Sequence, residues 1–210
     1  MKILTGLISS LTLLSLNVVG LSQVQAQTQG FRFKTDTATF FGNGCPNGTA
    51  RLVLNGDTAS VSFSGFQAKA SPFRVVSASC NLRFPLNVPS GYNVQPIRVR
   101  YLGFADVPTG GSADLNVIIS FQNADVTTIN NPNQTFTAGF SNTWSKNIDI
   151  IAKTINACNN PVSSVFGINT NLTARATSVP ANRETQIRID TIDTTIGPVL
   201  FQIQFKFNRC

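Results

Sequence analysis

The sequence predicts an all-β protein, an antiparallel β-sandwich of about ten strands stapled by two disulfides. Three observations lead to this prediction. Short segments with an apolar residue at every second position recur along the chain, and turn residues separate them. Charged residues make up only 12% of the chain, so its polar surface comes from Ser, Thr, Asn and Gln, most of which disfavour helices. Finally, four cysteines follow an apparent export signal.

The first 26 residues have the layout of a secretory signal peptide, with cleavage expected after Ala26. Lys2 supplies a positive start, and a largely apolar stretch follows over residues 3–21. Polar residues interrupt this stretch, and no later segment approaches about 20 apolar residues. We therefore expect a secreted protein with no membrane span in its mature chain.

The mature chain is long enough for one domain. We expect residues 27–36 to form a mobile N-terminal lead and residues 37–210 to form a single β-sandwich domain. A hairpin is predicted at residues 49–63, where Asn55 and Gly56 separate two strand-like runs and both tolerate positive φ. Further alternating stretches follow at residues 75–88, 97–101, 115–121, 136–140 and 187–189.

The last strand, over residues 199–207, has the clearest pattern. Val199, Phe201, Ile203, Phe205 and Phe207 alternate with polar residues. One face of this strand is predicted to be buried and the other wet, as in an antiparallel sheet. Phenylalanine is abundant, with 16 residues against two tyrosines and one tryptophan, and we expect most of these rings to fill the core between the sheets.

The four cysteines predict a disulfide framework, because the space outside the cell is oxidising. Three pairings are open, and we favour Cys45–Cys80 with Cys158–Cys210, since each closes a moderate loop within one half of the chain. The alternative is a zinc site. Such a site needs closely spaced cysteines or histidines, and the sequence has no CxxC motif and no histidine.

Several short stretches carry a resemblance to a known family. They are residues 44–48 and 79–82 around two cysteines, 101–103, Cys158 with residues 168–172, and the closing Arg209-Cys210. In these stretches, over roughly residues 40–210, the chain is similar to the secreted four-cysteine domain-of-unknown-function family 4360. The resemblance implies a small exported domain with paired cysteines and supplies no catalytic residues. Similar proteins commonly carry a tryptophan just before the terminal basic-x-Cys, where this chain has Phe207 and Asn208.

The absence of histidine from the sequence removes several functions. Ser-His-Asp and Cys-His catalysis, His-ligated metals and the usual general base at neutral pH are all excluded. No glycine-rich phosphate loop is present, so we expect no nucleotide cofactor. Arg98 and Arg100 should share a strand face, but without a clustered basic patch a solvated face is favoured, and no nucleic acid is expected as a partner.

Carboxylates leave one catalytic route open, because glycoside hydrolysis needs only two of them. Asp190 and Asp193 are the closest pair, but positions i and i+3 of a strand point to opposite faces. We therefore assign no catalytic residue. Among cofactors only calcium remains a candidate, and we assign no metal ligands. The pairs that could contribute oxygens are Asp106 with Asp114 and Asn123 with Asp125, neither of which matches an EF-hand loop.

Carbohydrate binding suits an exported β-sandwich, and sugars usually stack on exposed Trp or Tyr. The candidates are Trp144, Tyr92 and Tyr101. For Trp144, packing over the edge of the core is favoured over exposure, because large aromatic side chains are mostly buried.

We therefore expect a non-enzymatic exported protein that acts at the cell surface or in the extracellular matrix by binding a polymer or a protein partner. The alternative is a carboxylate-dependent hydrolase acting on extracellular polysaccharide, and a third candidate is a secreted inhibitor with a protruding, disulfide-braced loop. Two carboxyl groups about 5–10 Å apart in a groove would favour the hydrolase. A closed sandwich with scattered acids would favour the binding protein.

Overall fold

The computed structural model describes residues 32–33, 38–55, 58–122, 124–151, 154–189 and 201–210. The predicted signal peptide lies outside these residues, as do Asp190, Asp193 and Asn123. All the regular structure in the described residues is β-strand, arranged in two antiparallel sheets. The predicted fold class is therefore confirmed, and none of the described residues form a helix that could cross a membrane.

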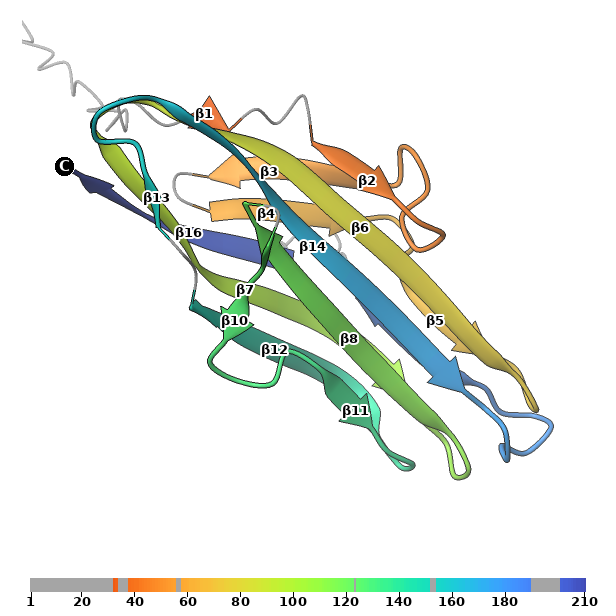
Figure 1. Ribbon diagram of the computed structural model, residues 1–210. Helices are drawn as coiled ribbons and strands as arrows, with labels where there is room; N and C mark the ends of the chain where they lie inside the picture. The colour runs from red at the N-terminus through yellow and green to blue at the C-terminus, as the bar shows by residue number, and fades with distance from the viewer. Residues whose placement is uncertain (1–31, 34–37, 56–57, 123, 152–153, 190–200) are drawn as a thin grey trace, which may run out of the picture.

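The first sheet, which we call sheet A, has seven strands in the described residues, with the main order β1-β6-β14-β8-β11. β2 pairs with β6, and β9 pairs with β8. Figure 1 shows the long strands β6, β14 and β8 running side by side. The bounds are β1 Arg32–Phe33, β2 Thr39–Phe41, β6 Val75–Val88, β8 Ser112–Phe121, β9 Ala124–Asp125, β11 Gln134–Phe136 and β14 Val162–Arg175.

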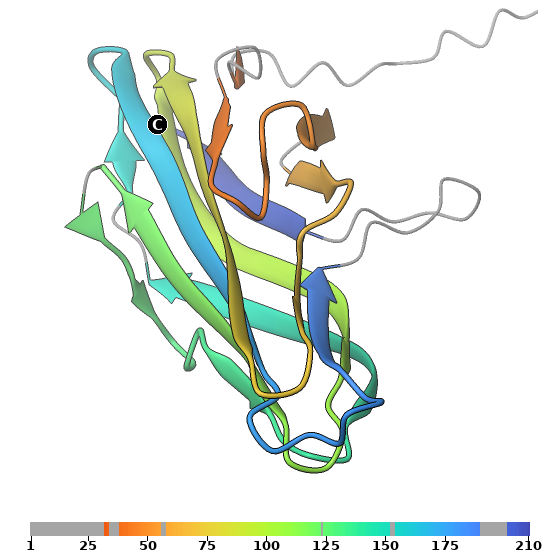
Figure 2. The same cartoon turned by 90° about the vertical axis from the view of Figure 1, so that its right-hand side faces the viewer.

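Sheet B has nine strands in the described residues, with the main order β10-β12-β7-β16-β4-β3. β13 and β15 pair with β7, and β5 pairs with β15. Figure 2 shows the layered arrangement from the side. The bounds are β3 Ala50–Asn55, β4 Thr58–Phe63, β5 Gln67–Ala70, β7 Tyr92–Asp106, β10 Thr127–Thr128, β12 Ser141–Ile151, β13 Ile155–Asn156, β15 Thr185–Ile189 and β16 Phe201–Arg209.

Two local predictions can be compared directly with the strands. The hairpin is present, because β3 and β4 pair from Ala50 opposite Phe63 to Asn55 opposite Thr58. Part of the expected lead over residues 27–36 lies within the described residues, and its mobility stays a prediction. Arg32 and Phe33 form β1 and pair with β6, so the sheet begins earlier than the alternation pattern indicated.

The core lies between the sheets and is rich in phenylalanine, as predicted. Phe84 of sheet A packs against Phe166 of the same sheet, with ring centroids 5.4 Å apart, and against Phe205 of sheet B at 6.0 Å. All three rings are almost fully buried. The inward side chains of each long strand alternate with outward polar ones, because successive residues of a strand point to opposite faces.

Tyr101 joins the two sheets through a buried hydrogen bond. Its hydroxyl lies 2.7 Å from Oγ1 of Thr170, which belongs to β14 of sheet A. Burial raises the pKa of the Tyr101 phenol well above its ordinary value, and the hydrogen bond to Thr170 only partly offsets this effect. Tyr101 therefore stays neutral and acts as a polar bridge within an apolar core.

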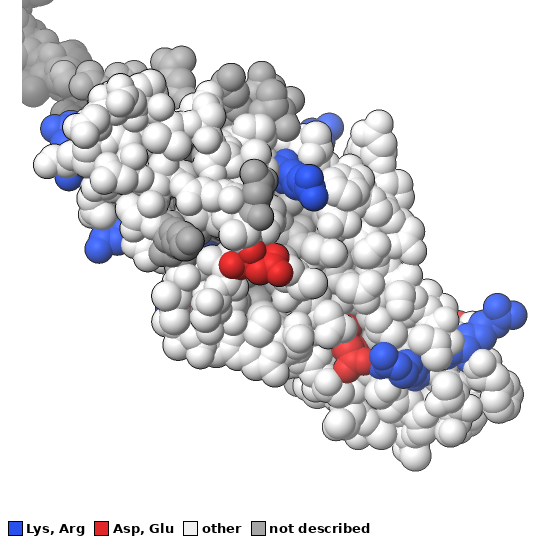
Figure 3. Space-filling model, viewed as in Figure 1, with Lys and Arg blue, Asp and Glu red and all other residues white. Residues whose placement is uncertain are grey.

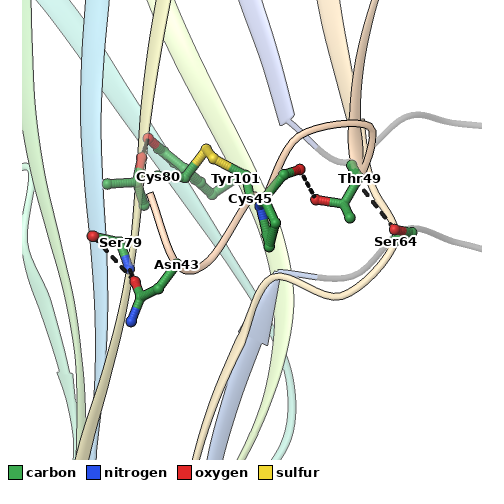
Figure 4. Close-up of a disulfide and its surroundings, with 9 residues drawn as sticks. Asn43, Cys45, Thr49, Ser64, Ser79, Cys80 and Tyr101 are labelled. Carbon is green, nitrogen blue, oxygen red and sulfur yellow. Dashed lines mark hydrogen bonds between the residues drawn. A yellow bond between two sulfur atoms is a disulfide. The ribbon is translucent and has the colours of Figure 1, made fainter. Parts of the chain in front are cut away.

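The structure confirms the favoured cysteine pairing. Cys45 and Cys80 are bonded and buried, with their Cα atoms 5.3 Å apart, and Figure 4 shows Asn43 turned toward Ser79 beside them. The Asn43 side chain accepts a hydrogen bond from the backbone N–H of Ser79 at 2.7 Å, which ties this segment to the edge of β6. The second disulfide, Cys158–Cys210, lies nearer the surface and anchors the end of β16.

Candidate functional site

The strands β5, β7 and β14 all end at the same end of the sandwich, which we call the tip. It comprises residues 71–74, 107–111, 137–140 and 176–184, and these loops gather at the lower right of Figure 1 and at the bottom of Figure 2. The backbone N–H of Phe73 donates to the carbonyl of Ala176 at 2.8 Å, and that of Val107 donates to Phe140 at 2.7 Å. These bonds between different loops hold the tip together.

Gly110 allows two of these loops to approach closely. Its φ is +83°, and a Cβ atom at this position would lie 2.2 Å from the carbonyl oxygen of Ser178. Only glycine fits this contact without displacing the neighbouring backbone. The loop between β7 and β8 is thus packed directly against the loop between β14 and β15.

A polar pocket of about 400 Å³ opens at the tip on the side of sheet B. Strands β5, β7 and β15 and the loops next to them supply its wall. Most of its lining side chains are charged or carry an amide or a hydroxyl group. The lining residues are Lys69, Ser71, Pro72, Asp106, Ala181, Asn182, Arg183, Glu184 and Gln186.

Glu184 is the best-fixed charged group of the pocket. Its carboxylate lies 2.7 Å from Nζ of Lys69 and accepts a hydrogen bond from Oγ of Ser71 at 3.2 Å. The hydrogen bond from Lys69 is the main cause that lowers the pKa of Glu184 below its ordinary value, and Ser71 acts in the same direction. Glu184 is therefore ionised at neutral pH and presents a fixed hydrogen-bond acceptor.

Asp106 places a second carboxylate in the same pocket, because it lies directly opposite Gln186 in the pairing of β7 with β15. Two carboxylates in one pocket are what a glycoside hydrolase requires. A general acid, however, needs a raised pKa, and the pKa of Glu184 is shifted in the opposite direction. Glu184 is thus suited to accepting a hydrogen bond and not to donating a proton to a leaving group.

Phe73 is an unusual residue at the rim of the tip. Its side chain is 79% exposed, although it directly follows Pro72 of the pocket lining. Its φ is +65°, a conformation that a bulky residue adopts only at a cost. Sequence reasoning missed Phe73 because it considered only tryptophan and tyrosine as stacking residues. The available signal was an aromatic residue in the turn that follows β5.

Two of the three candidate stacking residues are buried, and for Trp144 this is the packing that the sequence favoured over exposure. Trp144 is 5% exposed and packs on Phe136 with ring centroids 5.3 Å apart, and Tyr101 is fully buried between the sheets. Neither ring has a face available for a ligand, because both contribute to the core. Tyr92 is half-buried and begins β7 at the other end of the sandwich, so its role in binding stays a prediction.

The remaining sequence candidates are not brought together. Asp106 lies in sheet B and Asp114 in sheet A, where Asp114 accepts hydrogen bonds from Thr135 and Arg175. Asp125 lies in β9, and its proposed partner Asn123 is outside the described residues. Within the described ranges, no group of three or more His, Cys, Asp or Glu side chains lies close enough to hold a metal ion.

Comparisons with known proteins extend over most of the chain. The family model described as "Domain of unknown function (DUF4360)" matches residues 32–210, which confirms the resemblance seen in the cysteine-bearing stretches. A protein of Arthroderma benhamiae named "Uncharacterized secreted protein" is 25% identical over 183 residues, which cover 82% of this chain and 69% of that protein. This relative confirms the predicted location outside the cell.

Among solved structures, TmCBM61 in complex with β-1,4-galactotriose matches 83% of this chain and 90% of its own chain. Its sequence identity to this chain is 13% and the TM-score is 0.25.

Proposed function

The chain belongs to the DUF4360 family, and from this premise we propose that it is a secreted, non-catalytic module that binds a carbohydrate polymer through the pocket at its tip. One observation carries the proposal. The pocket places a fixed acceptor, Glu184, beside a donor, Lys69, and an exposed aromatic ring, Phe73, follows directly on its lining.

The chemistry of these groups matches that of a sugar. A sugar hydroxyl both donates and accepts hydrogen bonds, so it can bridge an ammonium group and a carboxylate, and bonds to such charged groups are stronger than bonds between neutral ones. The amides of Asn182 and Gln186 add further donors and acceptors. The apolar face of a sugar ring can pack on Phe73, as other apolar groups pack on aromatic rings.

The hydrogen bonds between the loops favour binding as well. A site that is already ordered loses less conformational entropy when a ligand arrives. Phe73 is held in its unfavourable backbone conformation by the bond from its N–H to Ala176. A strained, exposed aromatic residue next to a polar pocket is the kind of feature that accompanies a binding site.

The proposal is tested by measuring retention of the mature protein on a panel of immobilised oligosaccharides and by calorimetry on those that bind. We expect Phe73→Ala to weaken binding about tenfold, which corresponds to about 1.4 kcal/mol. Ile129→Ala is the matched control, because Ile129 is also highly exposed but lies away from the pocket. Lys69→Ala should weaken binding further, since it removes a donor and releases Glu184.

Three outcomes would overturn the proposal. The first is that no oligosaccharide binds. The second is that Phe73→Ala and Lys69→Ala bind as the unaltered protein does. The third is release of reducing ends from a bound glycan with loss of this activity in Asp106→Asn, which would make the hydrolase the better assignment.

A further inference from the structure

The outer face of sheet B carries a line of cations along its two central strands. β7 and β16 are neighbours in register, with Arg100 opposite Gln202 and Arg98 opposite Gln204. The residues between these positions, including Val99 and Ile203, are fully buried. Since side chains alternate along a strand, the arginine and glutamine side chains all lie on the outer face.

Lys206 continues the line past a bulge. The register shifts between Gln204 and Phe205, and after the shift Lys206 lies opposite Gln95. Phe205 is buried, so Lys206 again points outward, and it is exposed. We call Arg98, Arg100, Gln202, Gln204 and Lys206 the arginine–glutamine track.

The side chains beside the track leave it positively charged. Asn147 of β12 lies opposite Arg100, and Asp149 lies opposite Arg98. Among the described residues that lie in register with Arg98 or Arg100 across sheet B, Asp149 is the one carboxylate. Its Oδ1 lies 2.6 Å from Nε of Arg98. This contact fixes one edge of the guanidinium group and leaves its other N–H groups directed elsewhere.

The opposite surface of the molecule is different in character. The central strands of sheet A present mainly Asn, Ser and Thr on their outer face, for example Ser79, Asn171 and Asn116 in one row across β6, β14 and β8. In Figure 3, seen from the side of Figure 1, most of the visible surface is neither Lys or Arg nor Asp or Glu. The line of positively charged side chains is thus found on the outer face of sheet B and has no counterpart on the central strands of sheet A.

We propose that the arginine–glutamine track binds a linear acidic polysaccharide, whose carboxylates lie along β7 and β16. An arginine fork matches a carboxylate in two-point geometry, and glutamine amides can bind both carboxylates and hydroxyls. Successive outward positions of a strand are about 6.7 Å apart, which is the spacing of Arg98 and Arg100 along β7. Lys206 adds a third cation on the neighbouring strand β16, past the bulge. A linear polymer with a charge on each sugar can contact several of them at once.

Two observations favour an acidic polysaccharide over a nucleic acid. The protein is secreted, and acidic polysaccharides are polyanions of the space outside the cell. The described residues that lie in register with Arg98 and Arg100 across sheet B also include no aromatic side chain. Single-stranded nucleic acids, by contrast, are bound by bases stacking on aromatic rings.

This site is distinct from the tip pocket in position and in ligand charge. Asp106 of the pocket lies six residues beyond Arg100 on the same strand, about 20 Å away at the rise of a β-strand. A neutral glycan has no reason to prefer the track. In the pocket the two carboxylates are balanced by Lys69 and Arg183, so its lining has no net positive charge to attract a polyanion. The two proposals can therefore fail independently.

The test uses calorimetry of the mature protein with polygalacturonate oligomers, at low and at physiological salt. We expect Arg100→Gln and Lys206→Gln each to weaken binding about tenfold and to reduce its salt dependence, because each removes one contact between charges. Arg83→Gln is the matched control, since Arg83 is an exposed arginine on the outer face of sheet A and its loss changes the net charge equally. Phe73→Ala, the variant of the tip, should leave this binding unchanged.

The ligand has a matched control too. Fully methyl-esterified oligomers have the same sugars without charge and should not bind the track. The proposal is overturned if polygalacturonate does not bind even at low salt, or if Arg83→Gln weakens binding as much as Arg100→Gln, which would indicate unspecific attraction. It is also overturned if a single-stranded DNA of equal length binds more tightly and displaces the polygalacturonate.

Discussion

The two ends of the sandwich are closed in different ways, one by a disulfide and the other by hydrogen bonds between loops. At the end opposite the tip, the turn before β7 uses Gly91 at a φ of +89°. This end is closed covalently by Cys158–Cys210, and the N–H of Cys210 donates to the carbonyl of Gly91 at 3.0 Å. At the tip, Gly110 and Gly139 also adopt positive φ, but so does Phe73, and the described loops are joined by hydrogen bonds without a disulfide.

The difference between Gly91 and Phe73 shows where the fold contains backbone strain. Glycine adopts positive φ without steric strain, whereas phenylalanine does not. The tip is therefore less stable with Phe73 than it would be with glycine at this position. The turn before β7 has glycine at its position of positive φ, which suits its backbone. We infer that Phe73 is retained for its side chain, which is the element of the tip that the proposed binding uses.

The largest expected effect follows from opening the disulfide-bound end. Replacing both Cys158 and Cys210 by Ala should lower the free energy of unfolding by about 4 kcal/mol, because the bridge closes a long loop that restricts the unfolded chain. Urea denaturation measures this change. Where the variant is still folded, its affinity for oligosaccharides should equal that of the unaltered protein. A loss of affinity in the folded variant would show that the two ends are coupled.

A smaller loss of stability is expected when the hydrogen bond between the two sheets is removed from the middle of the molecule. Tyr101→Phe leaves Oγ1 of Thr170 without its partner in the core and should cost about 1–2 kcal/mol of stability. Thermal denaturation measures this cost, and Tyr92→Phe is a control at a half-buried tyrosine. An unchanged melting temperature in Tyr101→Phe would mean that the bond between the sheets contributes nothing net.

The comparison of the two turns is tested by one substitution in each turn. Phe73→Gly should raise the free energy of unfolding by about 1 kcal/mol, because it removes the strain of positive φ, while it abolishes the stacking contribution to sugar binding. Gly91→Ala should lower the free energy of unfolding by a similar amount and leave binding unchanged. If Phe73→Gly destabilised the protein, Phe73 would be serving as a packing residue rather than a binding residue.

The smallest expected effect concerns the ion pair of the pocket and depends on pH. The folded-state pKa of Glu184 lies below its ordinary value of 4.5, so its contribution to stability is present above that pH and is lost as the pH falls through the folded-state pKa. The difference in melting temperature between the unaltered protein and Glu184→Gln should therefore be small at pH 6 and vanish once the pH falls below the folded-state pKa. A difference that grows in acid would contradict the assigned ion pair.

The fold was largely predictable from the sequence because its signals are local. The alternation of apolar residues and the turn at Asn55 each depend on short stretches of chain. The prediction was less accurate where a turn interrupts an alternating run. Residues 136–140 read as a strand, but β11 ends at Phe136, and the N–H of Gly139 bonds to Val107 in a tip loop instead.

The candidate site could not be predicted in the same way. Lys69 and Glu184 are 115 positions apart in the sequence, and only the pairing of β5 with β15 brings them together. Aromatic residue types did not predict exposure either. Trp144 and Tyr101 are buried because they lie at inward positions of β12 and β7, whereas Phe73 is exposed because it lies in a turn.

The position of β16 has a consequence for the order in which the protein is made. This strand is the last along the chain, yet it lies between β7 and β4 in the centre of sheet B. Until residues 201–209 have been synthesised, the β3–β4 hairpin has no neighbour in its sheet, and residues 92–101 of β7 lack the partner that β16 provides. A chain emerging from a ribosome therefore cannot complete sheet B until this last strand has been made.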